Sequence, residues 1–484
     1  MNDDDSFEKY YSTAAAPVDD VEKSVRWPVV HSAAASAFWL FVGSALSLVA
    51  GLQVVYPSFL ADCPCLNYGH TKTAAWNILL YGFALQMVIT VLIYLVHRRS
   101  QTRMRHPITS FAASKIWNLG VFLGAIGIFM GDATGHAYFG MPAYAYGTMS
   151  VAFFWITVKT LVALHYRTER EFYISQVHLG AGAIWFMWML STALVLLHSQ
   201  PATGVAQLVV SKWYAANLFQ IVIGGAGLST IYYYLPQIAG RPLFSKQYAF
   251  TAFWCLIFFG SWTGISGNLP LPAWVTGLSS AFGILLIVPL LLVVINVWKT
   301  IEGNFSEVWN DIGGRFILAG TVCYTFWMLQ GIIGGLTTFS GLYQFTHYTT
   351  AVDTLFVYGF VGLTFMGACF RLMPRLTEHG ISRETAKITF ALVGLGLLVS
   401  FVALREAGIQ QNIGFEDSDF MTSVLSARVY LQVANIGTLI LLVGSGFFLF
   451  GMLKLTFDLL AKEFPLDKWV QDEPLAGETG GAQE

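Results

Sequence analysis

The side chains of this chain that could carry out chemistry are few and widely spaced. Its 484 residues include ten histidines and five cysteines. Cys63 and Cys65 lie close to His70, so this segment could bind a metal ion or close a strained disulfide. Two thiols one residue apart have poor bridge geometry, which makes a loop without either feature the simpler interpretation. The remaining cysteines sit singly in apolar runs, as small buried residues do: Cys255, Cys323 and Cys369.

Asp353 is the clearest ionisable residue inside an apolar run, the stretch from Thr349 to Pro374. A charged side chain is costly in a bilayer, so such a residue marks either a functional site or a paired structural group. We expect Asp353 to pair with Lys212 or with a loop amide. A structural role is favoured over a role in transport.

The histidines are weak candidates for metal ligands. His31 and His178 are the best intramembrane candidates, and both are expected to lie towards the cytoplasmic side as hydrogen-bonded or snorkelling side chains. Four others are predicted in or beside outward loops: His70, His136, His198 and His347. The last four are predicted at cytoplasmic helix ends, where a cation is favoured: His97, His106, His165 and His379.

The composition is that of a polytopic membrane protein. Hydrophobic residues make up 55% of the chain, charged residues 11%, and the mean hydropathy is +0.60. Soluble domains have about 25% charged residues. A net charge of -2 gives no indication of a nucleic-acid partner.

Apolar runs long enough to cross a bilayer recur about twelve times. The predicted spans are 31–57, 73–96, 107–131, 143–165, 173–198, 206–235, 247–266, 273–299, 315–338, 349–374, 385–404 and 430–459. Only helices satisfy their backbone groups segment by segment in lipid. The predicted fold class is therefore all-α, a bundle of about twelve transmembrane helices.

Lysine and arginine gather in alternate connections and near both termini, including 98–105, 167–170, 241–246 and 371–387. The positive-inside rule then places both termini in the cytoplasm, which requires an even number of spans. The predicted domains are a cytoplasmic N-terminal tail at 1–27, a transmembrane domain at 28–462 and a disordered cytoplasmic tail at 463–484. The first 25 or so residues are polar and acidic, unlike a signal peptide.

Several motifs resemble one known family when they are taken together. Segments 345–349, 361–365 and 373–376 resemble the tenth helix of the catalytic subunit of cbb3-type cytochrome oxidase. Lys212-Trp213-Tyr214-Ala215-Ala216-Asn217 and 231–236 resemble its sixth helix, and 253–258, 262–264 and 271–274 its seventh. The resemblance to the haem-copper oxidase and nitric oxide reductase superfamily covers nearly the whole chain. It implies a multi-pass protein of the bacterial inner membrane.

Active relatives use six imidazoles to hold two haems b and a copper ion, because ligation needs a lone pair from neutral imidazole. The resemblance places these ligands at residues that cannot supply one: Ala75, Ala216, Ser266, Gly267, Val352 and Thr354. It also places an active-site tyrosine at Gly260 and a glutamate at Gln330. No catalytic, cofactor-binding or metal residue is therefore predicted, and neither haem nor copper.

The resemblance predicts a packed bundle whose lost haem volume is filled by bulky side chains: Trp76, Trp213, Tyr214, Phe356 and Tyr358. The predicted function is a non-catalytic structural or assembly subunit of a respiratory or electron-transfer complex. Its expected partners are the lipid bilayer and other membrane or cytochrome c-type subunits. One alternative is an active terminal oxidase or nitric oxide reductase subunit. Another is a transporter or a lipid- or quinone-binding protein centred on Asp353.

Overall fold

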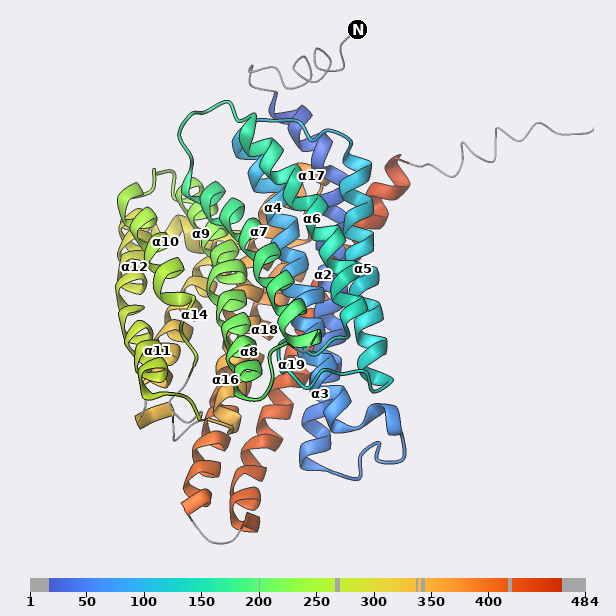
Figure 1. The fold of residues 1–484 in the computed structure, drawn as a ribbon. Helices are drawn as coiled ribbons and strands as arrows, with labels where there is room; N and C mark the ends of the chain where they lie inside the picture. The colour runs from blue at the N-terminus through green and yellow to red at the C-terminus, as the bar shows by residue number, and fades with distance from the viewer. Residues whose placement is uncertain are drawn as a thin grey trace, which may run out of the picture.

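A computed structural model describes residues 17–199, 201–265, 270–336, 338–340, 344–416 and 420–463. Within these ranges the chain forms helices and connecting turns, without a β-strand. The helices run side by side in one elongated bundle (Figure 1). The all-α prediction is confirmed.

Twelve helical spans follow one another along the chain. The first six are α2 (Val18–Val55), α3–η2–α4 (Tyr68–Asn77, Ile78–Ala84, Leu85–Ser100), α5 (Pro107–Phe129), α6 (Ala143–His165), α7–η3 (Ile174–Ala193, Leu194–His198) and α8–η4–α9 (Val205–Asn217, Leu218–Ile223, Gly224–Ile238). The others are α10 (Lys246–Gly260), α11–α12 (Ala273–Leu285, Ile287–Ile301), α14 (Ile312–Gly335), α16–η5–α17 (His347–Thr354, Leu355–Leu363, Thr364–Thr377), α18 (Arg383–Glu416) and α19 (Phe420–Glu463). Short helices η1 (Pro64–Leu66) and α13 (Phe305–Asn310) lie in connections.

Eleven of these spans are long and apolar enough to cross a membrane, among the helices that the structure describes. The exception is α10, whose 15 residues extend only about 22 Å at about 1.5 Å per residue. Its predicted range, 247–266, ends partly beyond the described residues. The α2 helix already begins at Val18, inside the predicted tail at 1–27. Residues 1–16 and 464–484 lie outside the described ranges, so the prediction for the two tails stays a prediction.

Three central spans differ from the rest in burial. The most apolar windows of the second, sixth and tenth spans are 100%, 89% and 89% buried, whereas those of the other long helices are at most 50% buried. Each central span contains a π-helical segment, η2, η4 or η5, and the fifth span ends in another, η3. π-Helical segments often accompany functional sites. These spans also hold most of the positions at which the resemblance places ligands.

The two ends of the described chain meet at one end of the bundle, the upper end in Figure 1. The Arg26 guanidinium forms an ion pair with the Glu463 carboxylate at 2.7 Å, and the Trp27 indole donates a hydrogen bond to the same carboxylate at 2.6 Å. An even number of spans predicts that both ends of the chain lie at the same end of the bundle, as they do here. We call it the basic end, because the arginine-rich connection between α4 and α5 lies there. Its placement in the cytoplasm remains a prediction.

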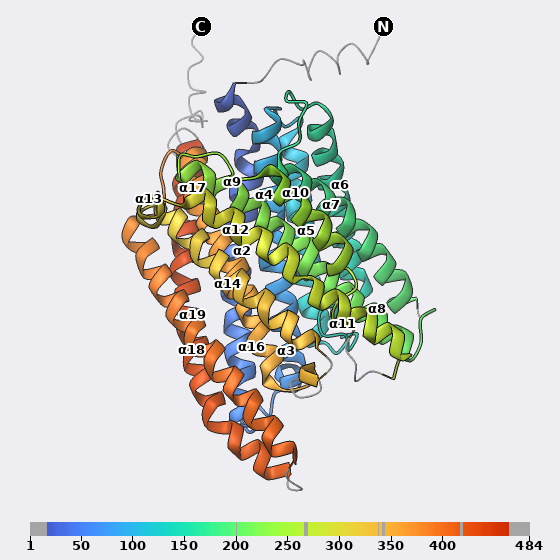
Figure 2. The same cartoon turned by 90° about the vertical axis from the view of Figure 1, so that its left-hand side faces the viewer.

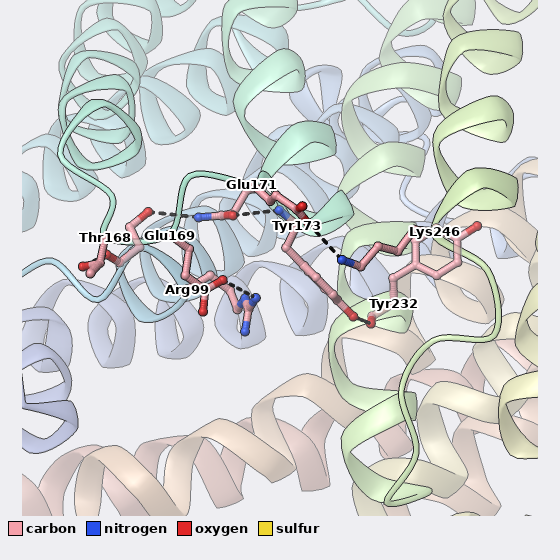
Figure 3. A network of polar contacts seen from close by, with 9 residues as sticks. Arg99, Thr168, Glu169, Glu171, Tyr173, Tyr232 and Lys246 are labelled. Carbon is pink, nitrogen blue, oxygen red and sulfur yellow. Dashed lines mark hydrogen bonds and ion pairs between the residues drawn. The ribbon is translucent and has the colours of Figure 1, made fainter. Parts of the chain in front are cut away.

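At the basic end, polar contacts fix the connection between α6 and α7 against neighbouring helices (Figure 3). Two exposed ion pairs hold it, Arg99–Glu169 at 3.2 Å and Lys246–Glu171 at 3.1 Å. The Tyr173 hydroxyl donates to the Tyr232 carbonyl at 2.6 Å, beneath the Arg99 guanidinium. Burial raises the pKa of Tyr173 to about 12, so the phenol remains a donor at neutral pH. Exposed ion pairs contribute little stability, so the hydrogen bond of the half-buried Tyr173 phenol is the stronger anchor.

The last two helices form a hairpin that extends past the rest of the bundle at the end opposite the termini (Figures 1 and 2). The α18 and α19 helices have 34 and 44 residues, or about 50 and 65 Å, against a hydrocarbon core of about 30 Å. The predicted ends at 404 and 430 are therefore wrong. The apolar runs do stop near Arg405 and Arg428, but both helices continue past those polar residues.

Candidate functional site

Two cavities flank α16 in the half of the bundle opposite the basic end. The first cavity, about 90 Å³, lies between α2, α3, α16, α18 and α19, and its lining includes Lys72, Ala75, Trp76, His347, Thr354 and Asn435. The second cavity, about 300 Å³, lies between α8, α11, α14 and α16, and its lining includes Tyr138, Lys212, Ala216, Gln330, Val352 and Asp353. Figure 2 shows α16 next to the lower end of α14.

The α16 helix faces both cavities because of its pitch. Residues two apart on an α-helix point about 200° apart. Val352 accordingly lines the second cavity and Thr354 the first. Ala75 lies in the first cavity with Thr354, and Ala216 lies in the second with Val352. The structure thus places four of the six positions in the linings of these two cavities, two in each.

The remaining positions can be placed only in part. Ser266 and Gly267 lie outside the described residues. Gln330 lines the second cavity, where its amide oxygen accepts a hydrogen bond from the Tyr348 hydroxyl. Gly260 lies behind that cavity, since a Cβ added there would be 3.2 Å from the Cβ of Gln220 in its lining.

The side chains present do not fit the haem and copper of active relatives. Such a site needs paired axial donors for a low-spin haem and three imidazoles for copper. The described lining of the second cavity contains no histidine, cysteine or methionine, and that of the first contains one histidine, His347. Throughout the described ranges, no group of three or more His, Cys, Asp or Glu side chains could hold a metal ion.

His347 and Lys72 are the cavity residues that sequence reasoning missed. His347, predicted in or beside an outward loop, is the half-buried first residue of α16. The missed signals were helix caps: the Asn67 side chain accepts from the His70 amide, and the Thr346 side chain accepts from the Tyr348 amide. Such caps place helix starts before the first apolar residue.

Asp353 has a partner that was not predicted. Its carboxylate accepts a 2.6 Å hydrogen bond from the hydroxyl of Tyr138, in the connection between α5 and α6. Lys212 interacts with Asp353 electrostatically but does not form a direct ion pair with it in the described structure. The predicted pairing with Lys212 or a loop amide is therefore wrong. Burial, and then the neighbouring carboxylate, raise the pKa of Tyr138 well above its usual value, which keeps it a donor.

The bulky side chains near the cavities fill the interior only in part. Tyr214 is buried and shares a 2.6 Å hydrogen bond with Tyr81, and the Phe356 ring packs 4.5 Å from that of Trp327. Trp76 and Tyr358 line the first cavity instead of closing it. The remaining residue of the predicted set, Trp213, packs against Trp188 at 5.4 Å. The predicted filling is therefore confirmed for Tyr214 and Phe356 but not for Trp76 and Tyr358, which leave a cavity open.

The other predicted candidates lie away from both cavities. The His178 ring nitrogen Nδ1 is 3.1 Å from the Ile174 carbonyl oxygen, and the His31 ring packs 4.9 Å from Phe111.

Near the opposite end of the bundle, the Cys63 and Cys65 thiols are free. The His70 ring contacts the Cys65 carbonyl and the Asn67 side chain, so it does not face the thiols. Among the other cysteines, Cys369 is buried as predicted, whereas Cys255 and Cys323 are only half-buried.

Comparisons with known proteins bear on these cavities. The family model "Cytochrome C and Quinol oxidase polypeptide I" matches residues 28–440. The chain is 23% identical to "Cytochrome c oxidase subunit 1 homolog" of Azorhizobium caulinodans, over 86% of this chain and 80% of that protein. It is 22% identical to "Cbb3-type cytochrome c oxidase subunit CcoN1" of Stutzerimonas stutzeri, over 87% of this chain and 91% of that protein.

Among solved structures, a haem-copper terminal oxidase dimer matches with a TM-score of 0.72 and 14% identity, covering 89% of this chain and 84% of that one. At this identity the match shows the fold alone. The family model, in contrast, extends over most of the sequence. The chain therefore belongs to the family of cytochrome c and quinol oxidase polypeptide I, the haem-copper oxidase subunit I family.

Proposed function

We propose that this chain is an integral membrane subunit that has lost the haem and copper ligands of its family. It acts as a non-catalytic structural or assembly subunit of a respiratory or electron-transfer complex. The bacterial inner membrane is its proposed location, with both termini in the cytoplasm.

One observation carries the proposal: α16 faces two cavities, and the residues at the family's ligand positions there have no lone pair suited to iron or copper. Ala75 and Thr354 face the first cavity, and Ala216 and Val352 face the second. A methyl, isopropyl or weakly donating hydroxyl group cannot replace imidazole as a ligand. Redox chemistry of the family type is therefore not supported by these side chains.

A structural role is supported by what the chain retains. The second, sixth and tenth spans remain the most buried helices of the bundle. Large apolar side chains cover the outer helices, among them Phe154 at 57%, Trp254 at 62% and Phe450 at 64% exposure. Such surfaces suit lipid or the helices of other membrane subunits.

Copurification tests the structural role. The full chain, tagged and isolated from its native membrane in a mild detergent, should migrate with other membrane or cytochrome-containing subunits at a fixed ratio. Deleting its gene should lower the abundance of those subunits. An isolated chain without stoichiometric companions, and companions unaffected by the deletion, would contradict the proposal.

A second candidate function is binding or transport of a lipid or quinone centred on Asp353. The observation that favours it is the position of this interior carboxylate in the wall of the second cavity, beside Lys212. A quinone that raises the melting temperature of the wild-type chain, but not that of Asp353→Asn, would support it. Equal shifts in both proteins would exclude Asp353 as the centre.

A further inference from the structure

The first cavity has polar groups at one end and apolar walls at the other. Lys72 lies in the second turn of α3 and His347 begins α16, at the end of the bundle away from the termini. Leu79 and Tyr358 line the same cavity deeper in the bundle. With about 1.5 Å of rise per residue, they lie about 10 and 16 Å below Lys72 and His347, respectively. The cavity is therefore amphipathic along its length.

The polar groups at its outer end have spare hydrogen-bonding capacity. The Lys72 ammonium lies 5.3 Å from the Tyr68 ring centroid and has neither a hydrogen bond nor an ion pair with any described residue. The side chains of His347 and Asn435 likewise make no hydrogen bond within the described part of the chain. By contrast, the deeper hydroxyl groups are bonded to protein atoms: Ser47 to Gly43, Thr354 to Thr350, Thr438 to Ala434, and Tyr358 to Ser44.

Positive charge in this cavity is not balanced by its own walls. Its described lining contains neither aspartate nor glutamate. Lys72 does interact with Asp353, but that carboxylate faces the second cavity, accepts the Tyr138 hydrogen bond and also interacts with Lys212. The Asp353 carboxylate is therefore shared between the ammonium groups of Lys72 and Lys212. A half-buried cation without a close partner is costly, so an anion would be bound favourably.

The site is held by close packing at its wall. A Cβ added at Gly51 would lie 2.1 Å from the Asn435 amide oxygen, so a larger residue there would displace this amide. Asn435 lines the cavity beside Gly51, together with residues of α3 and α16.

We propose that the first cavity binds an amphipathic anion. Its carboxylate or phosphate head accepts hydrogen bonds from Lys72 and His347, and its apolar tail lies between Trp76, Leu79 and Leu441. A fatty acid and an anionic phospholipid share this chemistry. The inference goes beyond the structural role proposed above and does not depend on it.

Thermal unfolding of the purified full chain in a non-ionic detergent tests the site. A long-chain fatty acid or a lysophosphatidic acid should raise the melting temperature, whereas the alcohol of the same chain length should not. Stabilisation by only one of the two anions would show whether the site prefers a carboxylate or a phosphate head group. Stabilisation by both would support a site for amphipathic anions of either kind. Equal effects of anion and alcohol, or no effect of either anion, would overturn the proposal.

Three variants make the test specific. Lys72→Gln should weaken binding of the anion on the order of tenfold, since it removes a charge-assisted hydrogen bond. Lys72→Arg should preserve binding, and Lys212→Gln in the second cavity is the matched control. Ala75→Phe should block the apolar tail while leaving the head-group residues in place. Wild-type affinity in both Lys72→Gln and Ala75→Phe would place the ligand elsewhere and refute the assignment.

Discussion

Ala75, Ala216, Val352 and Thr354 line two cavities, at positions where the resemblance to the oxidase family places electron-pair donors. Their placement follows from helix pitch, because two residues separated by one position must face opposite sides of α16. The same geometry explains why Val352 and Thr354 line different cavities. No side chain at these positions can bind iron as imidazole does.

Restoring the donors tests whether the pairing is right. The double variant Ala75→His/Thr354→His should bind haem in the first cavity, because two imidazoles would then face each other across the space between α3 and α16. The expected signal is a new Soret band after expression with added haem precursor. The single variants Ala75→His and Thr354→His are the controls, because each supplies only one imidazole. A double variant without a Soret band would show that these residues do not face a haem-sized space.

Tyr138→Phe tests the hydrogen bond on Asp353. Removing the hydroxyl leaves an interior carboxylate with one partner fewer, which should lower the free energy of unfolding by about 1–3 kcal/mol. Denaturant unfolding of the solubilised chain measures this change. Tyr144→Phe is the matched control, since its hydroxyl makes only an exposed 3.4 Å contact with Asp132. Equal effects in the two variants would rule out a special role for Tyr138.

At the scale of helices, the predicted ends are correct where a helix stops with its apolar run. They are wrong where a helix begins or continues through polar residues. The spans around 107–131 and 143–165 agree closely with α5 and α6, which end near the limits of their apolar runs. Lys72 and His347 were missed because predicted spans began at 73 and 349, just after them. The long ends of α18 and α19 were missed because water-exposed helix does not need an apolar sequence.

Close packing between α18 and α19 is expected to depend on small residues. A Cβ at Gly396 would lie 2.8 Å from the backbone nitrogen of Leu441, whereas a Cβ at Gly394 meets nothing within 4 Å. Gly396→Val should therefore destabilise the chain by about 1–3 kcal/mol through overpacking. Gly394→Val carries the same change in helix propensity and is the control. Similar melting temperatures for the two variants would contradict this packing.

For the molecule as a whole, the fold is shared with a solved haem-copper terminal oxidase at only 14% identity, so the bundle tolerates extensive change in sequence. The sequence predicted the bundle and its twelve spans because bilayer thickness and backbone hydrogen bonding leave few choices. It did not predict that the interior would keep two cavities, since packing of side chains cannot be read from hydrophobicity.

The orientation of the whole molecule can be tested with the native thiols. Cys65 is exposed at the end opposite the termini. If the basic end faces the cytoplasm, a membrane-impermeant maleimide should label Cys65 in intact spheroplasts, and Cys63→Ala/Cys65→Ala should lose that label. A cysteine introduced at Lys462 should react only after the membrane is opened. The reverse pattern of labelling would invert the topology.

The central claim is that this member of the oxidase family holds no redox centre. The most direct measurement is the absorbance spectrum of the full chain purified from its native membrane, reduced and oxidised, together with its iron and copper content. The account predicts no Soret band and far less than one iron or copper per chain. One or more haems per chain, with a Soret band that shifts on reduction, would contradict it.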